Sequence, residues 1–239
     1  MSAHDHRIPT PPIGGAILGV AIAGYEFPGL AGAVPCLRGP LGVEDHAAGG
    51  RGYALTFDDG PHPQGTPAVL EILRRERVRA TFFLVGEQVQ RNPGLAREII
   101  DAGHQVALHC HRHRNLLRLT PWQVRDDLSL AQETIEASTG TSPLLYRPPY
   151  GVLNLAALAL ARSKGWRTLL WSQWGRDWEA RATPASIAAR VCDGIADGAV
   201  LLLHDSDDYS APGSWRRTAA ALPRVLDTLA GLGLSPSDP

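Results

Sequence analysis

The stretch YALTFDDGP, residues 53–61, ends an apolar run with two adjacent carboxylates. Tyr53–Phe57 has the composition of a buried β-strand, and the Gly60-Pro61 pair stops that strand. Asp58 and Asp59 therefore follow a strand end, where neighbouring carboxylates repel each other unless a cation or a proton lies between them. The pair alone is ambiguous, because Asp-Asp before Gly-Pro is equally typical of a solvated turn.

A histidine pair further along the chain favours a metal site. His109 and His113 follow a strand-like run at 104–108 and lie four positions apart. On one face of a helical turn, two such imidazoles can reach the same ion. The spacing is that of helical zinc proteases, but their glutamate is missing. The third ligand and the base must then come from elsewhere, and Asp58 and Asp59 can supply them.

Three further apolar runs also end in polar side chains: LLYRPPYG (144–151), LLWSQWGRDW (169–178) and AVLLLHD (199–205). Segments with helical character separate them, and Thr120-Pro121 and Thr183-Pro184 are typical helix starts. Alternating strands and helices with functional groups at the carboxyl ends of strands are typical of a β/α barrel. We therefore expect an α/β fold with the active site at the C-terminal face of the strands.

The expected elements define this fold more closely. Strands are predicted at 53–57, 79–85, 104–108, 144–147, 167–172 and 199–203. Helices are predicted at 66–76, 92–102, 121–138, 153–164, 183–197 and 214–230. The last residues leave little room for another strand. The prediction is an irregular (β/α) barrel of six to seven parallel strands that remains open.

Taken together, these blocks resemble the polysaccharide deacetylases, the NodB-homology catalytic domain of carbohydrate esterases. The ordered motifs of that family read here as TFDDGP (56–61), H-x3-H (109–113), RPPYG (147–151), Asp-Trp (177–178) and LLLHD (201–205). The match runs from about residue 53 to the C-terminus, in the order and spacing of the family. The resemblance implies a metal-dependent amidohydrolase that removes an N-acyl group, most simply acetyl, from an amino sugar in a glycan.

The resemblance also implies a role for each motif residue. The metal ligands would be Asp59, His109 and His113. The catalytic groups would be Asp58 as general base, His204 as general acid, Arg147 orienting the base, Asp177 as the charge partner of the acid, and the backbone N–H of Tyr150 facing the oxyanion. Zinc is the expected ion, because two imidazoles and one carboxylate suit it, although cobalt or nickel would also fit. Three protein ligands leave positions open for water and an acyl oxygen.

One position departs from the family pattern and concerns the substrate. Many members carry an acidic residue three positions before the Asp-Trp aspartate, and this chain has Trp174 there. Aromatic faces stack on sugar rings, so Trp174 is the expected selector of substrate, with burial in the core as the alternative. Trp171 is expected in the core, and Trp215 beside the catalytic face. The expected substrate-contacting set is Trp174, Trp178, Tyr150 and Leu202.

Length and charge exclude several other classes. The chain has 239 residues, enough for one barrel domain, so we predict residues 1–50 as an extension without motifs and 51–239 as the catalytic domain. A net charge of −1 gives no indication of the overall positive charge that is typical of nucleic-acid-binding proteins. The 3 cysteines share no metal-like spacing and predict no disulfide framework. No partner protein is implied, and the expected partner is an N-acetylated sugar or glycan.

The N-terminal region gives two alternatives. Residues 13–25 are apolar but too short to cross a bilayer. Met1–Arg7 has few of the positive charges of a signal peptide, and no clear cleavage site follows. We favour a segment that packs on the barrel of a cytoplasmic protein. If residues 13–25 act as a signal, the protein is secreted or membrane-associated.

Two other functions remain open at this point. Relatives of this fold cleave other linear or cyclic amides, and only an assay separates that activity from deacetylation. The chain could also be a catalytically inactive carbohydrate-binding domain. The complete set of motif carboxylates and imidazoles, Asp58, Asp59, His109, His113 and His204, argues against that alternative.

Overall fold

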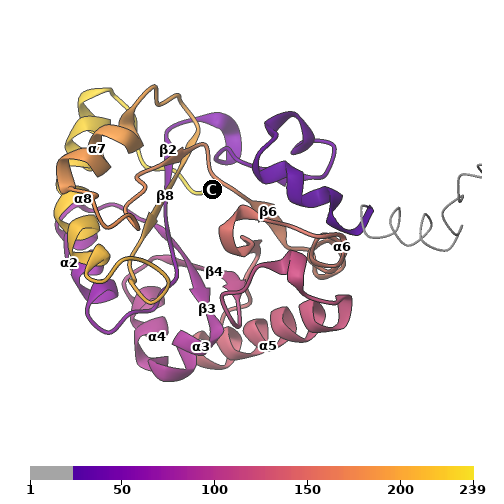
Figure 1. Ribbon diagram of the computed structural model, residues 1–239. Helices are drawn as coiled ribbons and strands as arrows, with labels where there is room; N and C mark the ends of the chain where they lie inside the picture. The colour runs from indigo at the N-terminus through magenta and orange to yellow at the C-terminus, as the bar shows by residue number, and fades with distance from the viewer. Residues whose placement is uncertain (1–23) are drawn as a thin grey trace, which may run out of the picture.

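The computed structural model describes residues 24–239 and shows a curled parallel sheet with helices around its outside (Figure 1). The strands run in the order β1-β6-β5-β4-β3-β2-β8-β7. Their bounds are β1 Val43–Glu44, β2 Tyr53–Asp58, β3 Thr81–Val85, β4 Gln105–Cys110, β5 Leu145–Tyr146, β6 Arg167–Leu169, β7 Gln173–Trp174 and β8 Ala199–His204. All of the strand pairs are parallel, which confirms the predicted α/β class and the open barrel.

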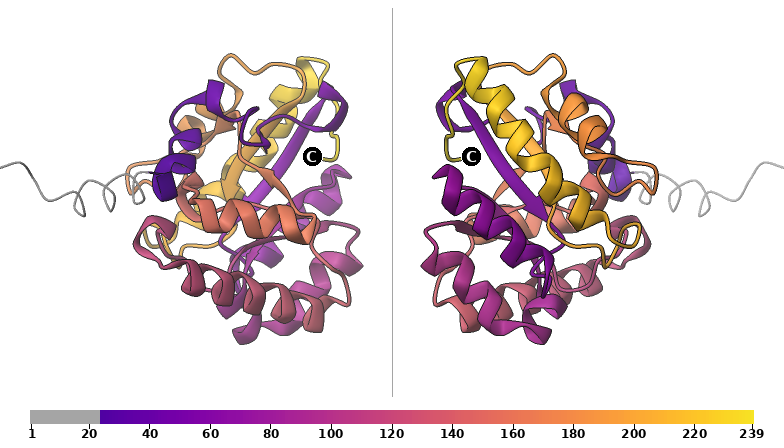
Figure 2. Two further views of the ribbon diagram at one scale, coloured as in Figure 1. Left: turned by 90° about the vertical axis from the view of Figure 1, so that its right-hand side faces the viewer. Right: turned by 90° about the vertical axis from the view of Figure 1, so that its left-hand side faces the viewer.

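Helices connect the strands and cover the outer face of the sheet (Figures 1 and 2). They are α2 Gly65–Glu76, α3 Gly86–Arg91, α4 Pro93–Asp101, α5 Pro121–Thr139, α6 Leu155–Lys164, α7 Pro184–Cys192 and α8 Ser214–Gly231. Short 3-10 helices lie at η1 Phe27–Gly32, η2 Pro35–Leu37, η3 Ala48–Gly50, η4 Leu116–Arg118 and η5 Pro149–Gly151. Thr120 and Thr183 each form a capping box at a helix start, as their sequence context predicts.

The sheet has 8 strands, so the predicted count of six to seven is wrong. The run predicted as one strand at 167–172 instead pairs with strands on both sides of the gap in the open barrel. The Leu170 N–H donates to Glu44 on β1, whereas the Ser172 N–H donates to Val200 on β8. The chain therefore leaves β6 and forms β7 against the opposite edge. Two-residue strands such as β1 and β7 are too short for a periodic sequence signal. The short helix α3 was missed for the same reason.

The alternation of side chains along the strands positions the site. Tyr53, Leu55 and Phe57 of β2 belong to the large hydrophobic cluster that packs against the helices. Ala54 belongs to a second cluster inside the barrel, with Ala47, Phe83, Ala107, Leu145, Leu169 and Val200. Because side chains in a strand alternate between faces, Thr56 and Asp58 share the inner face with Ala54. The sequence pattern of β2 thus delivers a carboxylate to the inside of the barrel at its C-terminal face.

The N-terminal region contributes to this fold through residues that carry no motif. The strand β1 pairs with β6, and η1 packs on the turn η5, where a Cβ on Gly32 would lie 2.7 Å from the Gly151 carbonyl oxygen. A domain division at residue 50 stays a prediction. The apolar run predicted at 13–25 lies almost wholly outside the described residues. Within residues 24–239, no helix combines the length and the apolar character that a membrane span requires.

Candidate active site

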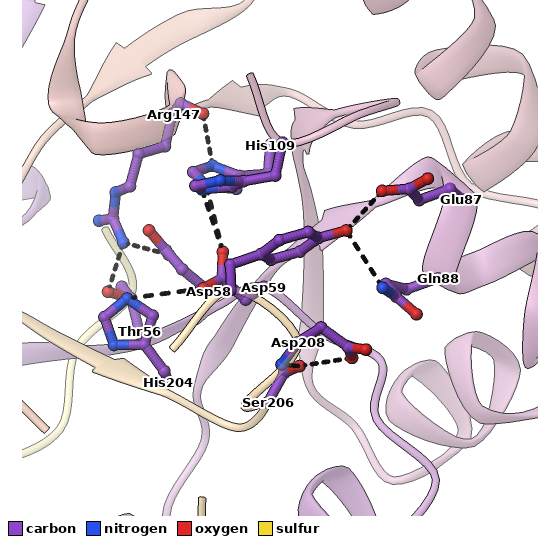
Figure 3. A network of polar contacts seen from close by, with 12 residues as sticks. Thr56, Asp58, Asp59, Glu87, Gln88, His109, Arg147, His204, Ser206 and Asp208 are labelled. Atoms are coloured by element: carbon purple, nitrogen blue, oxygen red, sulfur yellow. Dashed lines mark hydrogen bonds and ion pairs between the residues drawn. The ribbon is translucent and has the colours of Figure 1, made fainter. Parts of the chain in front are cut away.

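Two buried carboxylates lie at the carboxyl end of β2 (Figure 3). Asp58 is the last residue of the strand, and Asp59 begins the turn that follows it, with φ 79°. Each residue is 3% exposed. A left-handed φ is strained for a residue with a Cβ, so the surrounding structure must hold Asp59 in this conformation. The solvated turn considered from the sequence is therefore wrong, because both side chains face the interior.

Arg147 holds Asp58 in place from the end of β5. Its guanidinium is fully buried, and its Nη1 lies 2.7 Å from Asp58 Oδ1 and 2.8 Å from Thr56 Oγ1. Its other nitrogens donate to the carbonyl oxygens of Leu169 and Leu170. Burial raises the pKa of Asp58, and the charge of Arg147 opposes that rise. The arrangement gives one carboxylate oxygen a fixed orientation. That Asp58 is a base oriented by Arg147 stays a prediction.

Asp59, His109 and His113 form a group whose ligand atoms lie within 4.8 Å of one another. Asp59 Oδ1 is 3.6 Å from His109 Nε2 and 3.4 Å from His113 Nε2. The predicted set of metal ligands therefore comes together. The predicted helical turn between the two histidines is wrong. His109 lies within β4, whereas His113 lies in the loop after the strand.

The chemistry of this group fits a divalent cation. Asp59 Oδ1 is buried and has no hydrogen-bond partner among the described residues. Burial, helped by neighbouring carboxylates, raises the pKa of Asp59 to about 7 despite the opposing charge of His204. Burial lowers the pKa of His109 and of His113 to about 3, so both imidazoles are neutral, as metal ligands must be. His109 Nδ1 lies 2.7 Å from the Arg147 carbonyl oxygen, which leaves Nε2 free to face an ion.

His204 reaches the same cavity from the end of β8. Its Nδ1 lies 2.9 Å from Asp177 Oδ1, and its Nε2 lies 3.9 Å from Asp59 Oδ2. Asp177 is fully buried and also accepts hydrogen bonds from the His204 backbone and Thr218 Oγ1, each at 2.7 Å. Burial alone lowers the pKa of His204, but Asp177, Asp59 and Asp58 outweigh it and raise the pKa to about 10. These carboxylates therefore favour the protonated form of the imidazole.

Aromatic side chains form the wall of a cavity of about 290 Å³ over these groups. The lining residues outside the polar set are Tyr150, Trp171, Trp174, Trp178, Leu202, Tyr209 and Ser210. Trp174 is 41% exposed, so the alternative that it is buried in the core is wrong. Trp171 packs against both core clusters but also lines the cavity. Trp215 is absent from this lining and lies against His62 instead, with ring centroids 5.8 Å apart.

Sequence reasoning missed Tyr209, which lies in the loop after β8. Its ring stacks on His113 with centroids 4.5 Å apart and an angle of 16°. Its hydroxyl donates to Glu87 at 2.6 Å and accepts from Gln88 at 3.1 Å. Glu87 and Gln88 lie in α3, which the sequence pattern did not reveal. The only sequence signal for Tyr209 was that an aromatic residue follows shortly after His204, the predicted general acid.

Comparisons with known proteins agree with this geometry. The sequence profile described as polysaccharide deacetylase matches residues 45–169. A peptidoglycan-N-acetylglucosamine deacetylase of Bacillus cereus is 36% identical over 178 residues, which cover 74% of this chain and 80% of that protein. A chitooligosaccharide deacetylase of a Bradyrhizobium species is 40% identical over 159 residues, which cover 66% of this chain and 72% of that protein.

A solved structure shows the same arrangement of elements. It is a crystal structure of a peptidoglycan N-acetylglucosamine deacetylase in complex with 4-naphthalen-1-yl-N-oxidanyl-benzamide. Its TM-score with this chain is 0.76 at 27% sequence identity. The alignment covers 82% of this chain and 90% of that one.

Proposed function

We propose, since the chain belongs to the polysaccharide deacetylase family, that it removes N-acetyl groups from amino sugars of a glycan, releasing acetate and a free amine. The observation that carries this proposal is the convergence of three kinds of group on one cavity. A buried base candidate, a group that could bind a metal and a histidine that could act as an acid all line it, as Asp58, the Asp59-His109-His113 group and His204. Amide hydrolysis needs all three: activation of water, polarisation of the carbonyl, and protonation of the nitrogen.

Asp59, His109 and His113 would hold the metal, and zinc is the proposed ion because these ligands match its preference. A divalent cation bound there would act as a Lewis acid toward the acyl carbonyl and the attacking water. The family relationship supports a requirement for a metal. Asp59 Oδ1, which has no hydrogen-bond partner among the described residues, supports the proposed position of that metal. The identity of the ion is the part of this proposal that metal analysis decides.

The residues of the chain then divide the proton transfers between them. Asp58 accepts the proton of the attacking water, while Arg147 fixes its Oδ1 and keeps the carboxylate aimed at the cavity. His204 donates a proton from Nε2 to the leaving nitrogen, because Nδ1 is engaged by Asp177. Asp177 acts through His204 and is a positioning residue. The backbone N–H of Tyr150 is the proposed donor to the oxyanion, from a turn in which Tyr150 has φ 60°.

The choice of a sugar substrate comes from the cavity wall. Trp171, Trp174 and Trp178 form a continuous aromatic series, with neighbouring ring centroids 6.0 and 5.4 Å apart. Such faces stack on the apolar faces of sugar rings. Hydrolysis of another linear or cyclic amide uses the same groups and is the second candidate. The complete constellation of base, acid and metal group disfavours an inactive carbohydrate-binding domain.

Release of acetate tests the proposed function directly. The purified, zinc-loaded protein is incubated with N-acetylated peptidoglycan, with chitooligosaccharides and with small cyclic amides, and both acetate and new amines are measured. Equal amounts of acetate and glycan amine are expected. Hydrolysis of the cyclic amides without any acetate from the glycans would transfer the activity to the second candidate.

Truncation of Trp174 to alanine is expected to raise KM, or to change the preference among glycans, with a small change in melting temperature. The side chain is 41% exposed and contacts the cavity, so its loss removes stacking area rather than core packing. Trp122, which is 67% exposed and outside the cavity lining, provides the matched control. An unaltered KM with a melting temperature that falls sharply would assign Trp174 to packing.

Replacement of Asp177 by asparagine is expected to move the alkaline limb of the kcat/KM profile to lower pH. The Asp177 carboxylate favours the protonated imidazole of His204, so a neutral asparagine in its place should lower the pKa of His204. His204 then loses its proton at a lower pH, and the general acid is lost there. The loss of a charge at this distance is worth about 1–3 pH units. Asn retains an oxygen for Thr218, which limits disturbance of the fold. An alkaline limb at its original pH would remove Asp177 from the control of His204.

A further inference from the structure

A second groove adjoins the active-site cavity and shares two of its residues. His113 and Tyr150 line both spaces. The other lining residues of the groove are Arg114, Asn115, Arg118 and Leu119, which belong to the connection between β4 and α5. None of these lining residues is acidic. A ligand that extends from the metal group across Tyr150 therefore enters a positively charged space.

The positive charge of this groove is held on an ordered loop. The buried carboxylate of Asp127 accepts a hydrogen bond from the His111 backbone at 2.8 Å and pairs with Arg114 at 2.6 Å. These contacts fix the loop and neutralise Arg114. The Asn115 side chain accepts from the Leu117 backbone at 3.0 Å and starts the short helix η4. The position of Arg118 at the end of η4 is thus set by buried and capping contacts.

The guanidinium of Arg118 is available to pair with an acidic ligand. It is exposed, and within residues 24–239 no carboxylate lies within 4.0 Å of its guanidinium. The eight-residue segment HRHRNLLR, 111–118, has three arginines and no acidic residue, and only Arg114 is neutralised by Asp127. A guanidinium in this setting can bind a carboxylate through two parallel hydrogen bonds. Tyr150, 60% exposed at the junction, adds an aromatic face for a sugar ring.

We propose that this groove is a subsite for a carboxylate on the sugar unit next to the N-acetylated residue, and that Arg118 is its anion-binding group. The inference rests on the proposed function, because it places the scissile acyl group at the Asp59-His109-His113 group. It narrows the substrate class to glycans with acidic substituents on alternate units. A neutral chain of N-acetylglucosamine would bind the same site without this contact.

Two oligosaccharides of equal length test the proposal. One is neutral chitotetraose, and the other alternates N-acetylglucosamine with N-acetylmuramic acid, which adds a lactyl carboxylate. The zinc-loaded protein is expected to favour the acidic chain by about three- to tenfold in kcat/KM, mainly through KM, as an exposed charge-assisted contact allows. Arg118→Ala should abolish that preference and leave the neutral substrate unaffected. Rising salt should reduce the preference in the wild type.

The controls separate charge from size and from general electrostatics. Methyl esterification of the lactyl carboxylate keeps its bulk and should remove the preference. Arg125→Ala changes another exposed arginine nearby, one that packs on Trp122 outside the groove, and should retain the preference. A preference that survives esterification, or that survives Arg118→Ala, would overturn the inference.

Binding measurements distinguish a failure of the subsite proposal from a failure of the proposed function. Calorimetric titration of both oligosaccharides into wild type and Arg118→Ala reports the subsite without requiring turnover. Weaker binding of the acidic chain alone in the variant supports the subsite even if no acetate is released. Equal binding of the two chains to the wild type refutes the subsite even if both are deacetylated.

Discussion

Replacing Asp58 with asparagine is expected to lower kcat/KM by about 10²–10⁴-fold, the usual contribution of one general base, while metal content stays unchanged. The amide cannot accept the proton of water, but it has nearly the volume of the carboxylate. Its oxygen can still accept the hydrogen bond that Arg147 donates at 2.7 Å. Metal analysis and steady-state kinetics on the same preparation measure the two effects together.

Stability must be measured in the same variant, because Asp58 is also the charge partner of a fully buried guanidinium. Removing one member of a buried ion pair leaves an uncompensated charge and costs about 3–5 kcal/mol in other proteins. A lowered melting temperature is therefore expected, and assays belong well below it. Thr56→Val is a useful control, since it removes another acceptor of Arg147 and leaves the base in place. Near-normal turnover of the folded asparagine variant would exclude Asp58 as the base.

Much of the barrel follows from patterns that the sequence displays. The apolar run Tyr53–Phe57 predicts the buried strand β2, and the carboxylates that follow it correctly indicate where that strand ends. Apolar runs followed by polar groups place the chemistry at one face, because parallel strands end together. The strands at the two edges of the sheet could not be predicted from such patterns. The strands β1 and β7 are held by pairing to distant neighbours rather than by a pattern of their own.

The candidate site shows the same division between local and distant information. The H-x3-H spacing correctly brings two imidazoles to one carboxylate, yet the chain there is a strand end and a loop rather than a helix. A spacing of four residues is compatible with both conformations, so it predicts that the two imidazoles approach each other but not the backbone that carries them. Tyr209 could not be predicted, because its stacking on His113 depends on how a loop after β8 meets α3.

The combined change of His109 and His113 to alanine is expected to abolish tight metal binding and, with it, acetate release. These residues supply both imidazole nitrogens of the group, and Asp59 alone offers a single carboxylate. Changes outside the ligand shell already weaken metal sites 10–100-fold, so loss of two ligands should exceed about 100-fold. Wild-type protein should contain about one equivalent of zinc by elemental analysis, and the double variant should contain almost none after dialysis.

A matched histidine change shows whether this loss is specific. The side chain of His46 is 59% exposed and outside the metal group, so His46→Ala should keep its full equivalent of metal and its activity. Chelator treatment of the wild type should reproduce the inactive state of the double variant, and added zinc should restore only the wild type. Because buried imidazoles with a pKa of about 3 are neutral throughout the assay range, their loss removes ligands without altering charge. A double variant that retained a full equivalent of metal would place the ion elsewhere and refute the ligand set.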